Sequence, residues 1–190
     1  MVSRVGSGRA NLDYLLDHGD RIVRVCPPWS ACARRRMAAG LDEDRVIGRL
    51  LWDFVHGGAT QRLYDTLIRE VRRSGRKLAF DYRGDSPCTI RYMRMSLLPG
   101  PRGVVRFLSE VLHEQSQSRA VYLAHAPHQR RSELQHCGLC NRLSHNGRWH
   151  TLDHLIKTTD LIDDLMPTEV GDTVCDPCIL RIERATGVRL

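Results

Sequence analysis

The 190-residue sequence contains no apolar run that approaches the roughly 18 residues a helix needs to cross a bilayer. Its first eleven residues also lack the apolar core of a secretory signal peptide. The composition, with 42% hydrophobic and 27% charged residues, is typical of a soluble globular protein and not of a disordered one. We therefore expect no membrane association and a cytoplasmic location.

Catalytic signatures are also missing from the sequence. The segment Gly6-Ser7-Gly8-Arg9 follows no predicted strand, which excludes the usual phosphate-binding loop. No Ser/His/Asp arrangement and no pair of carboxylates stands out. A turn explains Asp85-Ser86-Pro87 better than a reactive hydroxyl does, because Asp and Ser hydrogen-bond to their own backbone and Pro cannot continue a strand. We expect a protein that is not an enzyme.

Seven cysteines are present, and four of them form two Cys-x-x-Cys pairs, Cys137 with Cys140 and Cys175 with Cys178. A gap of two residues lets both sulfurs of a pair reach one ion, and four thiolates are a common structural zinc site. The residues after Cys175 predict a helix that stops at Gly187. A helix N-terminus favours thiolate charge. The sequence therefore predicts one zinc ion bound by all four cysteines in a treble-clef-like module.

Other interpretations of these cysteines stay open. The pairs could be a thiol redox switch that releases zinc on oxidation, or four buried thiols. Nearby histidines are weaker ligand candidates, because four cysteines already complete the coordination shell. The spacer between the pairs exceeds the roughly 15–20 residues of the common four-cysteine pattern, so it should contain structure of its own. We expect a strand over 148–150 and a helix over 152–165.

The formal net charge of +7 suggests nucleic acid as a partner until the charge is divided along the chain. Residues 116–190 contain as many acidic as basic residues, so the basic excess lies in residues 1–115. A zinc finger that reads DNA normally has basic residues on the element that enters the groove. Nucleic-acid binding is therefore not favoured, and the cysteine module is better interpreted as a structural or protein-docking unit.

The remaining patterns predict an α+β fold with an antiparallel sheet and flanking helices. Alternating β-branched residues predict a strand over 21–25. The clearest amphipathic helix covers 60–73 and should stop at Ser74-Gly75. A three-strand meander over 77–82, 89–98 and 104–112 should follow, because both links are rich in turn-forming residues. Short helices are expected over 11–18, 29–39 and 116–125, and the apolar run over 46–55 should pass through the core.

Several segments follow one another in an order that resembles a known family. They are Asp20-Arg21-Ile22-Val23-Arg24-Val25, Trp29, Ile47-Gly48-Arg49 with Leu51-Trp52-Asp53-Phe54, Tyr82-Arg83-Gly84-Asp85-Ser86-Pro87, and Arg91-Tyr92-Met93-Arg94-Met95. In this order the chain resembles bacterial PAS sensor domains that are followed by a Cys-x-x-Cys tail. Two positions depart from that pattern: Cys26 replaces the usual Asn before the Trp segment, and Gly84 replaces the usual Cys before Asp-Ser-Pro.

The resemblance implies a small pocket between sheet and helices, which PAS domains use for haem, flavin, metabolites or nothing. Candidate pocket residues are Phe80, Met93, Met95 and Phe107, with a packed core as the alternative interpretation of each. His56 is the candidate haem ligand in the helical segment, and a loop histidine without a ligand is the alternative. The identity of any pocket ligand is not predicted.

We expect a PAS-like sensor domain over residues 1–115 with a loose N-terminus over 1–11, an exit helix and linker over 116–131, and the zinc module over 132–190. The predicted function is non-catalytic signal sensing or regulation, in which the zinc module mediates protein interaction. The resemblance also implies a protein partner or self-association as a dimer through the exit helix. A nucleic-acid-binding transcriptional regulator and the redox switch are the alternatives. Substitution of Cys175 by Ser is expected to melt the tail while the first domain stays folded.

Overall fold

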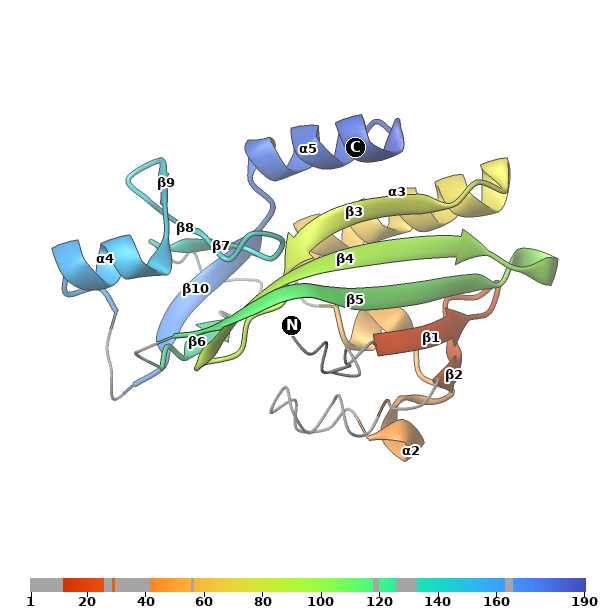
Figure 1. Cartoon of the computed structure of the whole chain (residues 1–190), viewed down its shortest axis with the longest axis horizontal. Helices are drawn as coiled ribbons and strands as arrows, with labels where there is room; N and C mark the ends of the chain where they lie inside the picture. The colour runs from red at the N-terminus through yellow and green to blue at the C-terminus, as the bar shows by residue number, and fades with distance from the viewer. Residues whose placement is uncertain are drawn as a thin grey trace, which may run out of the picture.

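The structure is a computed structural model that describes residues 12–25, 29, 42–55, 57–117, 120–125, 133–162 and 166–190. In these ranges the chain forms two five-stranded sheets, with helix α3 (Gly58–Ser74) packed on the first sheet and helix α5 (Asp176–Thr186) alongside its strand β3 (Figure 1). Within the described ranges, no helix combines the length and the apolar character that crossing a membrane requires.

The first sheet is antiparallel and has the strand order β2-β1-β5-β4-β3. Its strands are β1 (Leu12–Leu16), β2 (Ile22–Val25), β3 (Leu78–Arg83), β4 (Thr89–Pro99) and β5 (Val105–Ser116). Strands β3, β4 and β5 form the predicted meander, and β1 lies against β5 with Leu16 opposite Val105. The α+β class with an antiparallel sheet and flanking helices is confirmed for this part of the chain.

Helix α3 covers one face of the first sheet, as its amphipathic pattern predicts. Leu63, Leu67, Ile68 and Val71 are buried along one side of the helix. The helix ends at Gly75, which adopts a left-handed backbone and whose N–H donates to the carbonyl of Val71. Shorter helical turns precede and follow α3: α2 (Glu43–Val46), η1 (Leu51–Asp53) and η2 (Pro101–Gly103).

The second sheet is mixed and has the order β6-β10-β7-β8-β9. Its strands are β6 (Leu123–His125), β7 (Gln135–Cys137), β8 (Leu143–His145), β9 (Arg148–His150) and β10 (Thr168–Thr173). Strand β10 runs parallel to β6 and β7, whereas β7, β8 and β9 are antiparallel. Together with helix α4 (Leu152–Thr158) this sheet encloses a small core of its own, which includes Leu143, Leu155 and Val170.

The larger hydrophobic core extends across both parts of the chain. It contains Leu67 and Phe107 from α3 and the first sheet, and also Cys137, Leu139 and Ile182 from the C-terminal part. A backbone hydrogen bond of 2.8 Å, from the N–H of Arg83 to the carbonyl of Leu139, joins the end of β3 to the cysteine-containing loop. The C-terminal part therefore closes the core of the first sheet. The domain boundaries at 115 and 131 stay a prediction.

Three predicted helices differ from the structure. Residues 12–16 form β1, because pairing with β2 and β5 buries Leu16 more completely than an isolated helix could. The predicted exit helix over 116–125 is replaced by the end of β5 and by β6, which pairs with β10. Helix α4 stops at Thr158 and not at 165, since Thr158 and Thr159 are β-branched and Thr159 is extended.

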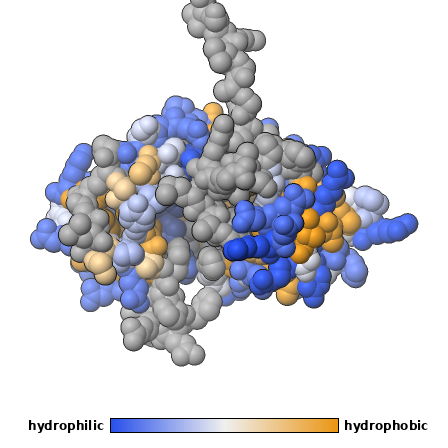
Figure 2. All heavy atoms as spheres, turned by 90° about the horizontal axis from the view of Figure 1, so that it is seen from below, coloured by the Kyte–Doolittle hydropathy of each residue, from blue (hydrophilic) through white to orange (hydrophobic). Residues whose placement is uncertain are grey.

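Other predictions are confirmed or lie outside the described residues. The strands over 21–25 and 148–150 are present as β2 and β9, and the run over 46–55 contributes the buried side chains Val46 and Leu51. The loose N-terminus over 1–11, most of the helix over 29–39, and the linker over 127–131 fall outside the described ranges. On the face that Figure 2 displays, patches of hydrophobic side chains lie beside hydrophilic ones.

Candidate metal centre

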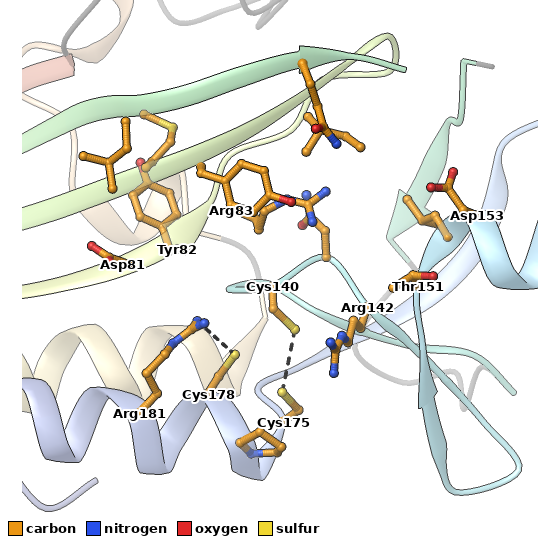
Figure 3. Close-up of a pocket in the computed structure, with 18 of the residues that line it drawn as sticks. Asp81, Tyr82, Arg83, Cys140, Arg142, Thr151, Asp153, Cys175, Cys178 and Arg181 are labelled. Atoms are coloured by element: carbon orange, nitrogen blue, oxygen red, sulfur yellow. Dashed lines mark hydrogen bonds between the residues drawn. The ribbon is translucent and has the colours of Figure 1, made fainter. Parts of the chain in front are cut away.

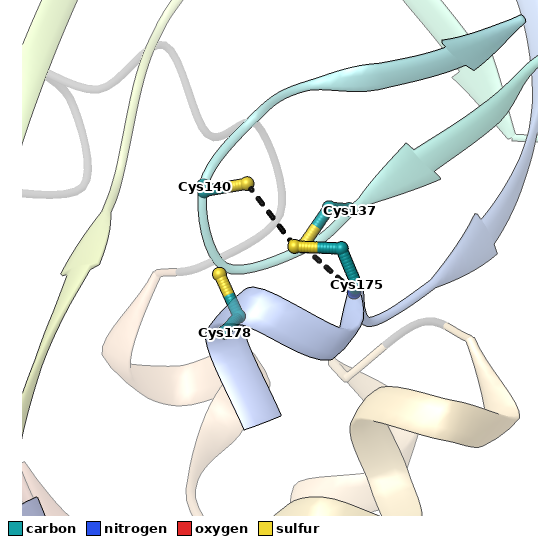
Figure 4. A group of neighbouring side chains, drawn as sticks. All are labelled: Cys137, Cys140, Cys175 and Cys178. Carbon is teal, nitrogen blue, oxygen red and sulfur yellow. Dashed lines mark hydrogen bonds between the residues drawn. The ribbon is translucent and has the colours of Figure 1, made fainter. Parts of the chain in front are cut away.

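Cys137 is the last residue of β7, and Cys140 lies in the loop that joins β7 to β8. Residues 137–140 are here called the knuckle loop. The N–H of Cys137 donates to the carbonyl of Arg142, and the N–H of Asn141 donates to the carbonyl of Cys137, both at 2.9 Å. Asn141 has a φ of 55°, a left-handed conformation that asparagine tolerates better than most residues. The resulting tight reversal turns both thiols toward the start of α5 (Figure 4).

Cys175 and Cys178 come from the first turn of α5. Cys175 is the N-cap of the helix, and the N–H of Cys178 donates to the carbonyl of Cys175 at 2.9 Å. Pro177 suits this turn, since an N–H at that position would have no partner within the helix. The sequence prediction that the second pair lies at a helix N-terminus, where negative charge is favoured, is thus confirmed.

The four sulfur atoms lie within 4.8 Å of one another, and Cys140 Sγ is 3.7 Å from Cys175 Sγ (Figure 4). A tetrahedral site with metal–sulfur bonds of about 2.3 Å places its sulfurs about 3.8 Å apart. Cys137, Cys175 and Cys178 are buried, whereas Cys140 is half-buried. The donor set and its spacing therefore fit one metal ion that prefers soft ligands.

The electrostatics of the cluster also favour a bound cation. Hydrogen bonds from the thiols of Cys140 and Cys178 lower the pKa of Cys137, and the backbone N–H of Cys175, 3.4 Å from Cys137 Sγ, acts in the same direction. The hydrogen bond with Cys137 and the negative charge on that sulfur raise the pKa of Cys140 to about 12. Once one sulfur is ionised, its charge opposes the ionisation of its neighbours, so four thiolates together require a cation among them.

A cavity of about 670 Å³ adjoins the cluster, here called the metal-side cavity (Figure 3). Its walls come from β3, β4 and β5, from the knuckle loop, and from the starts of α4 and α5. Three arginines, Arg83, Arg142 and Arg181, contribute to its lining. The guanidinium of Arg181 donates to Cys178 Sγ at 3.4 Å. Sequence reasoning did not find Arg181, although it stands three residues after a cysteine on a predicted helix.

The histidines near the cysteines are placed around the site and not in it. Among the described residues, no histidine joins the four sulfurs. His136 is buried, with Nε2 3.0 Å from Asn141 Oδ1 and Nδ1 3.7 Å from a carboxylate oxygen of Asp172. His136 therefore supports the knuckle loop. The rings of His150 and His154 stack on each other with their centroids 4.9 Å apart.

The residues predicted to line a ligand pocket have two different locations. Phe80, Met95 and Phe107 are buried in the larger hydrophobic core. Met93 is fully buried and lines the metal-side cavity. A ligand in the pocket between sheet and helices stays a prediction. His56, the haem-ligand candidate, lies outside the described residues, as do Cys26 and Cys32, and Cys88 is an exposed thiol away from the cluster.

The chain is similar to several solved structures. No family model matches the chain, and no curated protein matches it. A domain of an HTR-like protein from Haloarcula marismortui ATCC 43049 is similar over 54% of this chain and 98% of that chain, with 15% identity and a TM-score of 0.40. The PAS domain of an HTR-like protein from Haloarcula marismortui is similar over 56% and 81%, with 17% identity and a TM-score of 0.32. Because both TM-scores lie under 0.5, function is inferred from this chain's own residues.

Proposed function

We propose that this protein is a non-catalytic sensing or regulatory protein, in which a PAS-like sheet is joined to a structural zinc site for protein interaction. The observation that supports this proposal is the cluster of four sulfurs within 4.8 Å, contributed by a knuckle loop and a helix N-terminus. That arrangement of ligands is typical of treble-clef zinc modules. Cys137, Cys140, Cys175 and Cys178 would hold the ion.

Zinc is the metal that suits this site best. Tetrahedral sites of four thiolates hold zinc or iron, and zinc supplies no redox chemistry of its own, so its role there is to hold segments together. Here the segments are the knuckle loop and α5, which also belong to the core of the first sheet. A bound ion would therefore fix the position of α5 relative to β3.

Interaction with a protein partner is the role we propose for the C-terminal part. Residues 116–190 have balanced charge, which does not favour nucleic acid, and they expose large apolar side chains at Tyr122, Met166 and Leu180. A partner or a second copy of the chain would bind at such side chains. A conformational change in the first sheet would be transmitted to the bound partner through the shared core. A cytoplasmic, reducing environment would keep the four thiols available for the metal.

Native mass spectrometry of the full chain, purified without chelator, tests the proposal. One zinc ion per chain is expected, and any additional small-molecule mass would identify a ligand of the predicted pocket. Cys175→Ser should lose the zinc, whereas Cys88→Ser should retain it, because Cys88 is an exposed cysteine outside the cluster. A wild-type protein that contains iron, or no metal, would contradict the zinc assignment.

A further inference from the structure

The metal-side cavity gives small molecules a route to one side of the sulfur cluster (Figure 3). Cys140, Cys175 and Cys178 contribute to its wall, whereas Cys137 is not among the described residues that line it. Of the four cysteines, Cys140 alone is half-buried, and the other three are buried. Cys140 is therefore the most exposed of the cysteines that a small oxidant in this cavity can reach.

Cationic side chains surround this route. Arg142 and Arg181 line the cavity together with Arg83. Asp85 forms an ion pair with Arg83. Two carboxylates, Asp81 and Asp153, line the cavity. Asp81 forms an ion pair with Arg94 at 2.7 Å. Reactive cysteines typically occupy partly exposed, electropositive surroundings of this kind.

We propose that Cys140 and Cys175 are a redox modification site, at which hydrogen peroxide joins the two thiolates in a disulfide and causes release of the metal. This inference rests on the proposed metal site and adds a regulation to it. Cys175 is the partner because its Sγ lies 3.7 Å from that of Cys140 and because both line the same cavity. A disulfide requires the two sulfurs to approach by about 1.7 Å.

The reaction proceeds in two steps. The thiolate of Cys140 attacks one peroxide oxygen, so that an S–O bond forms, the O–O bond breaks, and the departing hydroxide takes a proton to become water. The thiolate of Cys175 then attacks the sulfenic sulfur, an S–S bond forms, the S–O bond breaks, and a second hydroxide is protonated to water. The two sulfurs lose two electrons in total, and one peroxide is reduced to two waters.

The loss of two ligands would reach the first sheet through contacts of the knuckle loop. The carbonyl of Leu139 accepts the hydrogen bond from Arg83 at the end of β3. Gly138 lies so close to α3 that a Cβ there would be 3.0 Å from Thr60 Oγ1. Movement of the knuckle loop therefore frees the end of β3 and the first turn of α3. Oxidation of the cysteines thus changes the conformation of the first sheet and its helix.

The test uses the whole zinc-loaded chain with Cys88→Ser, which lacks the one thiol that is exposed among the described residues. Zinc content is measured first, hydrogen peroxide is added in stoichiometric amount, and released zinc is followed with a chromogenic chelator. Peptide mapping without reductant should find the Cys140–Cys175 disulfide, and reductant plus zinc should reverse both changes. Zinc that resists peroxide, or a disulfide within either Cys-x-x-Cys pair, would overturn this inference. Absence of zinc at the start would instead refute the proposed metal site.

A matched pair of variants tests the role of the cavity. Arg142→Gln removes a cation from its wall but keeps the backbone carbonyl that accepts from Cys137. We expect this variant to bind zinc as the unmodified chain does and to release it several-fold more slowly under peroxide. Arg148 is an exposed residue of β9 and is not among the residues that line the cavity. Arg148→Gln should therefore release zinc at the unchanged rate. Equal rates in both variants would rule out the cationic route.

Discussion

Gly57 shows at the level of one residue how closely the two parts of the chain approach each other. Its φ is 82°, and a Cβ built on it would lie 2.4 Å from Cβ of Asp172 in β10. Both the positive φ and the close approach of Asp172 thus require glycine at this position. Because β10 carries the chain toward Cys175, this contact places the metal centre against the N-terminus of α3.

We expect Gly57→Ala to lower the free energy of unfolding by about 2–5 kcal/mol, the sum of a left-handed backbone cost and an overpacking cost. Urea denaturation measures the change. Gly48→Ala is the matched control, because Gly48 has the same φ of 82° and a Cβ added there would meet no described atom within 4 Å. The control should lose only the backbone part, about 1–2 kcal/mol. Equal losses would mean that the contact with Asp172 contributes nothing.

Arg181 is the second residue whose role depends on the site. Its guanidinium donates to Cys178 Sγ, and groups that hydrogen-bond to metal ligands typically change metal affinity by about 10–100-fold. We expect Arg181→Gln to weaken zinc binding by such a factor in a chelator competition titration. Arg184 is exposed in the last turn of the same helix. Arg184→Gln should leave the zinc affinity unchanged.

Helix α5 is the element that joins the metal centre to the first sheet. Ile182 is fully buried in the larger core, whereas Leu180 is 50% exposed on the same helix. We expect Ile182→Ala to destabilise the protein by about 2–5 kcal/mol through the cavity it creates. Leu180→Ala should change stability by less than about 0.5 kcal/mol. A small effect of Ile182→Ala on the first sheet, measured by hydrogen exchange of β3, would argue against a shared core.

Elements with strong local signals could be predicted from the sequence. Helix α3 has an apolar stripe and a glycine stop, the meander has turn-rich links, and the cysteine spacing identified all four residues of the cluster. Strands β1 and β6 were missed because their partners are distant in sequence. Leu12, Leu15 and Leu16 also fit a helical spacing, and only pairing with β5 decides otherwise. The metal-side cavity and the contact of Gly57 depend on packing, which no local pattern encodes.

At the scale of the whole molecule, the larger core changes what loss of the metal should do. Cys137, Cys175 and Cys178 belong to the same buried cluster as Leu67 and Phe107. The expectation from the sequence was that the C-terminal part alone would melt when zinc is lost. Because the core is continuous, we now expect both parts to lose stability together.

Removal of zinc by a chelator should therefore lower the stability of the whole chain in one cooperative transition. Metal at a thousandfold excess over its Kd stabilises a folded state by about 4 kcal/mol, and this amount is lost on removal. Thermal unfolding followed by tryptophan fluorescence and by far-UV circular dichroism should give coincident curves at a lower temperature, and Cys175→Ser should behave in the same way. Two separate transitions would show that the C-terminal part unfolds by itself.

The position of β1 in the sheet has a consequence for synthesis on the ribosome. Among the strands of the first sheet β1 is made first, and one of its two partners is β5, the last of them to be made. At about 5–20 residues per second, roughly 5–20 s separate the two strands during translation. Throughout that interval β1 can pair with β2, but the side of β1 that pairs with β5 stays uncovered. The nascent chain should therefore depend on chaperones that hold its N-terminal segment until β5 emerges.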